Sequence, residues 1–216
     1  MCEDELFVMP LQLDRSEAEL AQLVSLLSQD EVERAGRFRR GIDRGRYITC
    51  RAHLRLALGR LTGQDPASVE IRYGIRGKPF LPSKEGQRSV HFNVSHSDHL
   101  ALIAIVHDRE VGVDIERCKQ IPDYDQLAER FFSPVECQEL RSLPEGEQLR
   151  RFYRCWTRKE AYIKARGDGL YLDLASFAVT LLPEQAPMIR QVSDSAELLT
   201  SWTLSVLEID PDFEAA

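Results

Sequence analysis

The chain of 216 residues contains 43% hydrophobic and 29% charged residues, which is typical of a folded globular protein and excludes a disordered or low-complexity one. Its length suits one domain or two closely packed halves. Because no apolar run approaches the length of a membrane span and the acidic N-terminus does not resemble a signal peptide, we expect a cytoplasmic protein that does not contact a membrane.

The net charge of −7 conceals a strongly basic segment. Residues 34–60 contain nine arginines and a single acidic residue, an aspartate. A basic block in an acidic protein predicts a local site for anions, which could be phosphates, nucleic acid or an acidic partner protein.

The first predicted element is a strand over residues 6–13. A helix follows, and it begins at a capping box formed by Ser16 and Glu19. Apolar residues with a helical period predict a further helix over about 43–61, with an arginine stripe beside its core face. Runs rich in β-branched residues then predict strands that pair in one sheet, over 69–73, 90–94, 101–106 and 111–116.

The second half repeats this order of elements. We predict a helix near 133–140 with its own capping box, a long helix over 145–166, and strands over 177–182, 188–192 and 202–209. Short echoes occur at an offset of 114 or 115 residues. Arg37-Phe38, Tyr47-Ile48 and Arg51 of the first half are matched by Arg151-Phe152, Tyr162-Ile163 and Arg166 of the second. These features favour two similar halves, which we place at residues 1–107 and 108–216.

Two acidic residues lie close together in the last strand predicted for the sheet. Strand alternation places the side chains of Asp114 and Glu116 on the same face. Neighbouring carboxylates repel each other unless a cation or a shared proton is present, and such hard oxygen ligands suit Mg²⁺. The alternative is the solvated outer face of a strand.

The long predicted helix carries Glu160 and Lys164 one turn apart. Such a pair is the usual pattern of a solvated helix surface, and this is the alternative to a functional role. Trp156 lies on the same stripe as Glu160, which indicates that this face is turned toward protein.

Groups that suit a phosphate occur at two places. Ser95 and His96 end a predicted strand, although a lone histidine is more often structural. The segment Arg76-Gly77-Lys78-Pro79 is a tight basic turn that lacks the frame of a phosphate-binding loop. Together with the acidic residues and the Glu/Lys pair, these groups indicate phosphoryl-type chemistry.

Five short motifs occur in a fixed order between residues 30 and 175. They are Gly77-Lys78-Pro79, Asn93-Val94-Ser95-His96, Gly112-Val113-Asp114-Ile115-Glu116, Phe131-Phe132-Ser133-Pro134-x-Glu136 and Trp156-x-x-Lys159-Glu160-Ala161-Tyr162-x-Lys164. In this order and spacing the chain resembles the 4'-phosphopantetheinyl transferase superfamily, and in particular its larger, monomeric, surfactin-synthetase-activating (Sfp-like) branch. The resemblance implies an α+β fold of two similar α/β halves packed as a pseudo-dimer.

The resemblance also implies an activity, namely transfer of 4'-phosphopantetheine from coenzyme A to a serine of an acyl or peptidyl carrier protein, with release of 3',5'-ADP. It implies that Asp114, Glu116 and Glu160 hold Mg²⁺, or Mn²⁺ in its place. Glu160 would also act as the base, and Lys164 would stabilise the departing 3',5'-ADP. Contacts to coenzyme A are implied for Arg34, Arg46, Arg51, Arg76, Gly77, Lys78, Pro79, Ser95, His96 and Lys164.

Two alternatives stay open at this point. The arginine stripe could belong to a nucleic-acid-binding protein, although no aromatic platform accompanies it and we expect no nucleic-acid partner. A magnesium-dependent nucleotide hydrolase would instead cleave coenzyme A without a carrier protein. The sequence does not distinguish carriers of fatty-acid, polyketide or nonribosomal-peptide biosynthesis, and we expect a monomer from the resemblance.

Overall fold

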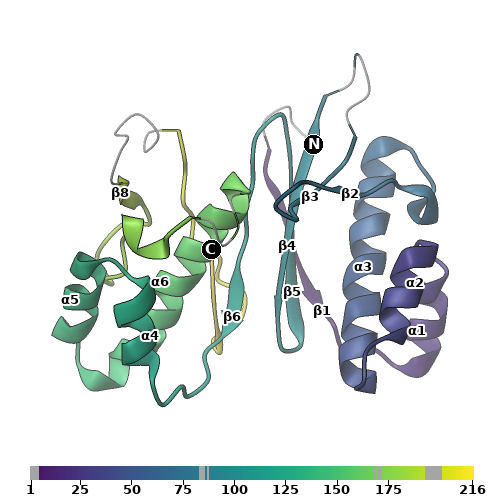
Figure 1. Cartoon of the computed structure of the whole chain (residues 1–216). Coiled ribbons are helices and arrows are strands. Elements are labelled where there is room, and N and C mark those ends of the chain that lie inside the picture. The colour runs from purple at the N-terminus through teal and green to yellow at the C-terminus, as the bar shows by residue number, and fades with distance from the viewer. Residues whose placement is uncertain (1–4, 83–85, 87, 168, 170–171, 193–200) are drawn as a thin grey trace.

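The computed structural model describes residues 5–82, 86, 88–167, 169, 172–192 and 201–216, which form a mixed α+β fold (Figure 1). The first half consists of β1 (Phe7–Gln12), α1 (Glu17–Val24), α2 (Gln29–Gly36), α3 (Gly41–Thr62), the 3₁₀ helix η1 (Pro66–Ser68), β2 (Arg72–Tyr73), β3 (Pro79–Phe80), β4 (Val90–Ser97) and β5 (Leu100–His107). The second half consists of β6 (Ile115–Arg117), α4 (Tyr124–Phe131), α5 (Pro134–Ser142), α6 (Glu145–Arg166), the 3₁₀ helix η3 (Leu174–Ser176), β7 (Phe177–Val179), β8 (Ile189–Val192) and β9 (Phe213–Ala215).

Both halves follow the same order of elements, a strand, two short helices, a long helix, a 3₁₀ helix and further strands. The long helices α3 and α6 have 22 residues each and begin 104 positions apart. Each ends at a glycine with left-handed backbone, Gly63 with φ +66° and Gly167 with φ +71°, a conformation that favours glycine at a helix C-terminus. Equivalent elements are therefore separated by about 104 residues.

Only part of the predicted echo between the halves joins equivalent elements, since Tyr47-Ile48 lies in α3 and Tyr162-Ile163 lies in α6. Arg37 caps the C-terminus of α2, whereas Arg151 lies inside α6. The offset of 114 or 115 residues therefore differs from the 104 positions that separate the first residues of α3 and α6. Two dipeptides are too short to set a register, whereas helix length and the capping glycine follow from the geometry of each half.

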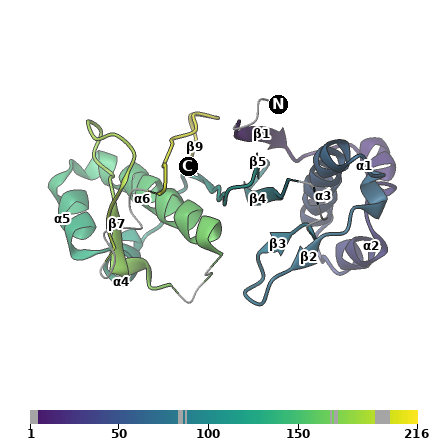
Figure 2. The ribbon, with the colours of Figure 1, turned by 90° about the horizontal axis from the view of Figure 1, so that it is seen from above.

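The central strand β5 joins the two cores of the molecule (Figures 1 and 2). It pairs antiparallel with β1 on one edge and β4 on the other. Alternate side chains of a strand point to opposite faces. Ile103 and its neighbours on one face pack against Leu54 and Leu58 of α3. Leu102 and its neighbours on the other face pack against Ile115 and the rest of the second half.

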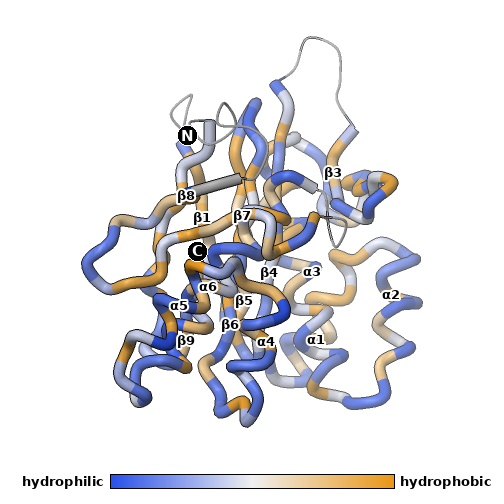
Figure 3. Tube along the Cα trace, turned by 60° about the vertical axis from the view of Figure 1, so that its left-hand side comes forward, coloured by the Kyte–Doolittle hydropathy of each residue, from blue (hydrophilic) through white to orange (hydrophobic). Residues whose placement is uncertain are grey.

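The outer helices α1 and α2 alternate hydrophilic and hydrophobic residues, as Figure 3 shows, because each buries one face. Ala35 of α2 and Leu27, which lies between the two helices, are buried against Ile48 and Ala52 of α3, and the partly buried apolar residues of α1 pack against this cluster. The part of the chain that the structure describes includes no helix that is both long and apolar enough to span a membrane.

The predicted helices are confirmed, and α6 has the predicted bounds. The prediction of one four-stranded sheet over 69–116 is wrong. Only the end of 69–73 is a strand, β2, which pairs with β3, and only the end of 111–116 is a strand, β6, which pairs with β9. Residues 202–209 form no strand, and β9 lies a few residues later.

Candidate active site

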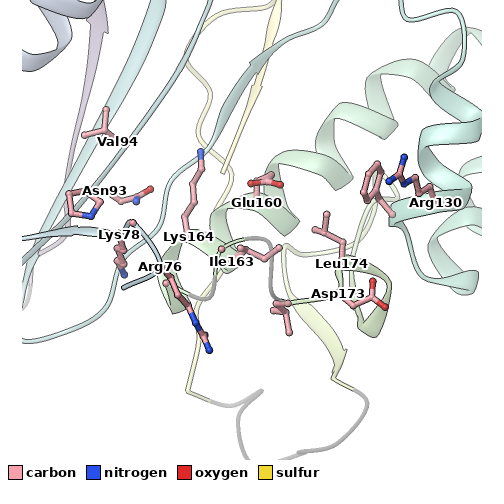
Figure 4. A pocket seen from close by; sticks show the side chains of 16 residues that line it. Arg76, Lys78, Asn93, Val94, Arg130, Glu160, Ile163, Lys164, Asp173 and Leu174 are labelled. Carbon is pink, nitrogen blue, oxygen red and sulfur yellow. The ribbon is translucent and has the colours of Figure 1, made fainter. Parts of the chain in front are cut away.

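The candidate site lies where β4 of the first half faces α6 of the second half. Two cavities of about 370 and 540 Å³ adjoin there, since both are lined by Val94, Glu160 and Lys164. The smaller cavity brings together the predicted residues Ser95, His96, Asp114, Glu116, Glu160 and Lys164. The larger cavity combines Arg76, Gly77, Lys78 and Pro79 with Glu160 and Lys164 (Figure 4).

The helix α6 presents Glu160 and Lys164 to both cavities. Trp156, one turn earlier, lines the smaller cavity beside them. All three residues are half-buried. The prediction that this helix face is turned toward protein is therefore confirmed, and the alternative of a solvated surface pair is wrong.

Lys164 extends across the boundary between α6 and the segment before β6. Its Nζ atom donates to Oδ1 of Asp114 at 2.6 Å and to Oγ of Ser95 at 3.0 Å. Ser95 in turn donates its hydroxyl proton to the same Oδ1 atom at 2.7 Å. Asp114 is only 2% exposed, so these contacts fix a buried carboxylate between groups of the two halves.

Burial, together with neighbouring negative charge, raises the pKa of two acids of the smaller cavity, Glu160 and Glu116. Desolvation, followed by the charge of Asp114, raises the pKa of Glu160 above its usual value. Desolvation also raises the pKa of Glu116, with the charge of Asp114 adding to it and a hydrogen bond from Ser97 opposing it. Like charges in a desolvated site disfavour ionisation, so an added cation would stabilise this cluster.

Whether the acids fit a divalent cation can be judged from a buried oxygen atom of Asp114. Oδ2 of Asp114 is buried and has no hydrogen-bond partner, although most buried polar atoms have one. Within the described ranges, no three His, Cys, Asp or Glu side chains are already grouped to hold a metal ion. Mg²⁺ is usually bound by one or two carboxylates together with water and substrate phosphates. The acids therefore fit a Mg²⁺ ion that is shared with a phosphate ligand.

The basic side of the larger cavity is organised around Lys78, which leads into β3. Its Nζ atom donates to Oε2 of Glu110 at 2.5 Å and to the carbonyl oxygen of Ala165 in α6 at 2.6 Å. Lys78 therefore links the first half to the end of the long helix of the second. In Figure 4, Lys78 lies on one side of the cavity and Arg130 on the other, with Glu160 and Lys164 between them.

Gly112 allows the segment before β6 to touch α6. A Cβ atom at this position would lie 2.0 Å from the carbonyl oxygen of Ala161 and 2.3 Å from the amide nitrogen of Ala165. Both atoms belong to the helix backbone, which cannot move aside as a side chain can. The glycine therefore sets how closely the segment with Asp114 approaches the helix with Glu160.

Of the described candidate residues, Arg46 is held in ion pairs and lines neither cavity. Its Nε atom lies 2.7 Å from Oδ1 of Asp14, and its Nη1 atom lies 2.8 Å from Oδ1 of Asp98. Desolvation and the positive charges of Lys164 and Arg46 lower the pKa of His96, so Arg46 is close enough to act electrostatically on the site.

Arg34 and Arg51 also lie outside the linings of both cavities. The guanidinium of Arg34 is exposed and stands 5.5 Å above the ring centroid of Tyr47. Arg51 donates from Nε to Oε1 of buried Glu31 at 2.6 Å. The structure does not bring these two arginines together with the acids.

Sequence reasoning missed several residues of the site. Arg130 and Asp173 line the larger cavity, and Glu110 holds Lys78. Arg130 directly precedes the quoted motif that begins at Phe131, so proximity to the motif could have signalled it. Glu110 carries no comparable signal, because its role depends on a contact across 32 positions of the chain.

Comparison with known proteins places this geometry in a family. Two family models match the chain, "4'-phosphopantetheinyl transferase superfamily" over residues 110–215 and "4'-phosphopantetheinyl transferase, N-terminal" over residues 13–107. The 4'-phosphopantetheinyl transferase HetI of Nostoc sp. is 38% identical over 212 residues, which cover 98% of this chain and 85% of the relative.

Relatives from Bacillus subtilis show the same extent of similarity. A 4'-phosphopantetheinyl transferase from this organism is 32% identical over 208 residues, covering 92% of this chain and 89% of the relative. The 4'-phosphopantetheinyl transferase Sfp is 30% identical over 208 residues, covering 95% of this chain and 88% of the relative. The similarity spans both halves and both sides of the cavity, and the chain belongs to the 4'-phosphopantetheinyl transferase superfamily.

Proposed function

We propose that this protein transfers the 4'-phosphopantetheine group of coenzyme A to a serine of an acyl or peptidyl carrier protein and releases 3',5'-ADP. The observation that carries the proposal is the meeting of Asp114, Glu116, Glu160 and Lys164 in one cavity that adjoins a basic one. A pyrophosphate that must be cleaved needs cations to bind it, a base for the attacking hydroxyl and a cation for the leaving group.

Coenzyme A would lie across the two cavities with its phosphates toward the basic groups. Lys78 and Arg76 line the larger cavity, and Ser95 and His96 line the smaller. The positive φ of Gly77, +82°, permits the tight turn that presents Lys78 and Pro79. We assign these groups to the pyrophosphate and the 3'-phosphate.

Arg34, Arg46 and Arg51 lie outside the cavities and differ in how readily their side chains could reach coenzyme A. Arg34 is exposed, so we assign it to the 3'-phosphate and adenine side. Arg46 and Arg51 would each have to leave a carboxylate partner to reach a phosphate. We therefore expect these two to contribute to binding less than Arg34.

The chain's own groups can carry the proton transfers. Glu160 takes the proton of the carrier serine as the serine oxygen bonds to phosphorus. The bond from phosphorus to the 3',5'-ADP oxygen breaks in this displacement, and the ammonium of Lys164 stabilises the charge on that oxygen. Asp114, Glu116 and Glu160 would hold Mg²⁺ or Mn²⁺, and the bound ion would neutralise negative charge on the pyrophosphate.

We further propose that the two halves form a pseudo-dimer with coenzyme A between them. The first half, residues 1–107, would provide contacts to the phosphates and the adenine, and the second half, residues 108–216, would provide the metal ligands and the catalytic groups. The repeated order of elements, at about 104 residues, supports this division. One chain then supplies both walls of the cleft, which is consistent with a monomer.

The carrier protein would approach a surface rich in positive charge. The exposed arginines between α2 and the start of α3 are Arg37, Arg39, Arg40 and Arg44. An acidic partner meets such a surface faster through complementary charge. Neither a nucleic-acid-binding protein nor a nucleotide hydrolase is favoured by the family membership.

The test is intact-mass spectrometry of a panel of apo carrier proteins incubated with this protein, coenzyme A and Mg²⁺. At least one carrier should gain the mass of phosphopantetheine, and Glu160→Gln, which keeps the size of the side chain, should abolish the gain. Absence of modification across the panel, or release of 3',5'-ADP without any carrier, would contradict the proposal.

A further inference from the structure

Three side chains of β4 bind backbone N–H groups of the second half in a regular series. These bonds run from Val113 N to Asn93 Oδ1 at 2.9 Å, from Ile115 N to Ser95 Oγ at 3.4 Å and from Arg117 N to Ser97 Oγ at 3.1 Å. Each partner lies 20 positions further along the chain. Figure 1 shows β4 and β6 alongside each other where the halves meet. We call this series the β4 ladder.

Each serine of the β4 ladder also holds an acid. Ser95 donates to Oδ1 of Asp114 at 2.7 Å, and Ser97 donates to Oε2 of Glu116 at 2.7 Å. A serine hydroxyl has one proton and two lone pairs. Because the backbone N–H occupies a lone pair, the single proton is directed to the carboxylate. One hydroxyl therefore sets both the backbone register between the halves and the orientation of a carboxylate.

We infer that Ser97 is a positioning residue for metal binding, which acts by fixing the carboxylate of Glu116. The inference rests on the proposed function, in which Glu116 is a metal ligand. Partners that hydrogen-bond to a ligating carboxylate orient it, and their loss typically weakens metal binding about 10–100-fold. Ser97 has this relation to Glu116 through a bond of 2.7 Å.

A variant of Ser97 tests the positioning of Glu116 more cleanly than a variant of Ser95 would. Ser95 lines the smaller cavity and accepts a hydrogen bond from Lys164, so its loss would disturb several groups together. Ser97 is half-buried, and it is not one of the described residues that line the two cavities. Its influence on the reaction therefore passes through Glu116 and the backbone of Arg117.

The test compares Ser97→Ala with Ser97→Thr in the full chain. Threonine keeps the hydroxyl and suits a strand. Binding of Mn²⁺ in the presence of coenzyme A is followed by the loss of the free-ion electron paramagnetic resonance signal. Ser68→Ala is the control, because Ser68 also donates to a carboxylate, Oδ2 of Asp65 at 3.3 Å, but in the 3₁₀ helix η1.

We expect Ser97→Ala to weaken Mn²⁺ binding about 10–100-fold. The Mn²⁺ concentration for half-maximal transfer should rise by the same factor, with kcat at saturating metal much less affected. Ser97→Thr should stay near the wild type, and Ser68→Ala should equal it. These results, with a melting temperature close to wild type for Ser97→Ala, would support the positioning role.

Two outcomes overturn the inference while the proposed function stands. One is unchanged Mn²⁺ binding by Ser97→Ala in a wild-type protein that binds Mn²⁺ and modifies carriers. The other is an equal loss of Mn²⁺ binding and of melting temperature in both the alanine and the threonine variant, because this pattern indicates a role in folding alone. A wild-type protein that neither binds Mn²⁺ nor modifies a carrier overturns both proposals.

Discussion

Glu136 and Lys159 form an ion pair in which carboxylate oxygen and ammonium nitrogen lie 2.7 Å apart and neither side chain is exposed to solvent. Lys159 also donates to the carbonyl oxygens of Leu174 and Phe177, at 2.9 and 2.6 Å. Glu136 accepts the N–H of Val179 at 2.7 Å. The pair therefore ties α5, α6 and β7 together behind the face of α6 that lines the cavities.

The first half contains a matching arrangement. Glu31 of α2 is buried and accepts from Nε of Arg55 in α3 at 2.5 Å. Arg55 also donates to the carbonyl oxygen of Val69, just after the 3₁₀ helix η1, at 3.0 Å. In both halves, an acid of the second short helix thus holds a cation of the long helix, and this cation binds carbonyl groups near the 3₁₀ helix.

We predict that Lys159→Met destabilises the protein strongly, because it leaves the buried Glu136 without its cation. Breaking such a pair typically costs about 3–5 kcal/mol. Adding Glu136→Gln should restore part of this loss, since the glutamine is neutral and still accepts hydrogen bonds. The free energy of unfolding, measured by urea denaturation, checks both variants.

The control for this prediction is Arg141→Met, which removes an exposed ion pair with Glu129. Exposed pairs contribute at most about 1 kcal/mol, so this variant should unfold near the wild type. If Lys159→Met cost no more than Arg141→Met, the buried pair would not have the stabilising role that we assign to it.

The meeting of Asp114, Glu116, Glu160 and Lys164 in one cavity could be predicted from the sequence because each motif is local. Glu160 and Lys164 face the cavity as their helical spacing indicates, and Asp114 and Glu116 share it although only Glu116 lies in the strand β6. What the motifs do not encode is how the two segments meet. Lys159, in the same motif as Glu160, points away from the cavity to a buried glutamate, and its position in the sequence does not reveal this.

The strand predicted over 111–116 fails for a tertiary reason. The N–H group of Val113, which precedes β6, binds the side chain of Asn93 in β4 and not the backbone of a neighbouring strand, whereas Ile115 is already part of β6. Propensity describes how well residues suit a strand, but the partner that takes each N–H is chosen by the packing of the halves. The arginine-rich segment illustrates the same limit, since Arg51 and Arg55 bind a buried glutamate within the core of the first half.

We predict that Gly112→Ala separates the acids of the cavity from α6. The added methyl group would meet the backbone of Ala161 and Ala165, so the segment before β6 must shift away from the helix. A misplacement of about 1 Å in a reacting geometry can cost on the order of 100-fold in rate. The transfer rate to a carrier protein should fall by this order, together with a lower melting temperature.

Gly36→Ala is the matched control for this prediction. A Cβ atom at Gly36, the last residue of α2, would meet nothing within 4 Å. This variant should keep the wild-type transfer rate and melting temperature. A Gly112→Ala protein with normal activity would show that the close approach is not required for the site.

We predict that loss of Arg34 weakens the binding of coenzyme A, whereas loss of Arg51 lowers the stability of the fold. Arg34 is exposed, so Arg34→Ala should raise KM for coenzyme A several-fold and leave the melting temperature unchanged. Arg51 holds the buried carboxylate of Glu31, so Arg51→Ala should cost about 1–3 kcal/mol of unfolding free energy. Steady-state kinetics and thermal unfolding of both variants check this. The reverse pattern would assign Arg51, and not Arg34, to coenzyme A.

We predict that Asp98 makes stability depend on pH. Hydrogen bonds from Arg117 and then Arg46 hold the pKa of Asp98 well below its usual range in the folded protein. Its contribution is therefore complete above the pKa of the unfolded chain, roughly 3.9, and is lost as pH falls toward the lower folded value. Asp98→Asn should be clearly less stable than the wild type at pH 7, and the gap should shrink steadily as the pH falls below about 4.

Arg117, which lowers the pKa of Asp98 most, provides the control for this prediction. In an Arg117→Met background, Asp98 loses the partner that lowers its pKa most, so the added effect of Asp98→Asn at pH 7 should be smaller than in the wild type. Urea denaturation at several pH values gives the unfolding free energies of the wild type, Asp98→Asn, Arg117→Met and the double variant. The effect of Asp98→Asn is then compared in the two backgrounds, and the contributions of other carboxylates cancel in each difference. If the wild type and Asp98→Asn were equally stable at every pH, Asp98 would stabilise the β4–β5 turn through its backbone alone, since its φ of +51° lies in the left-handed region where asparagine is equally at ease.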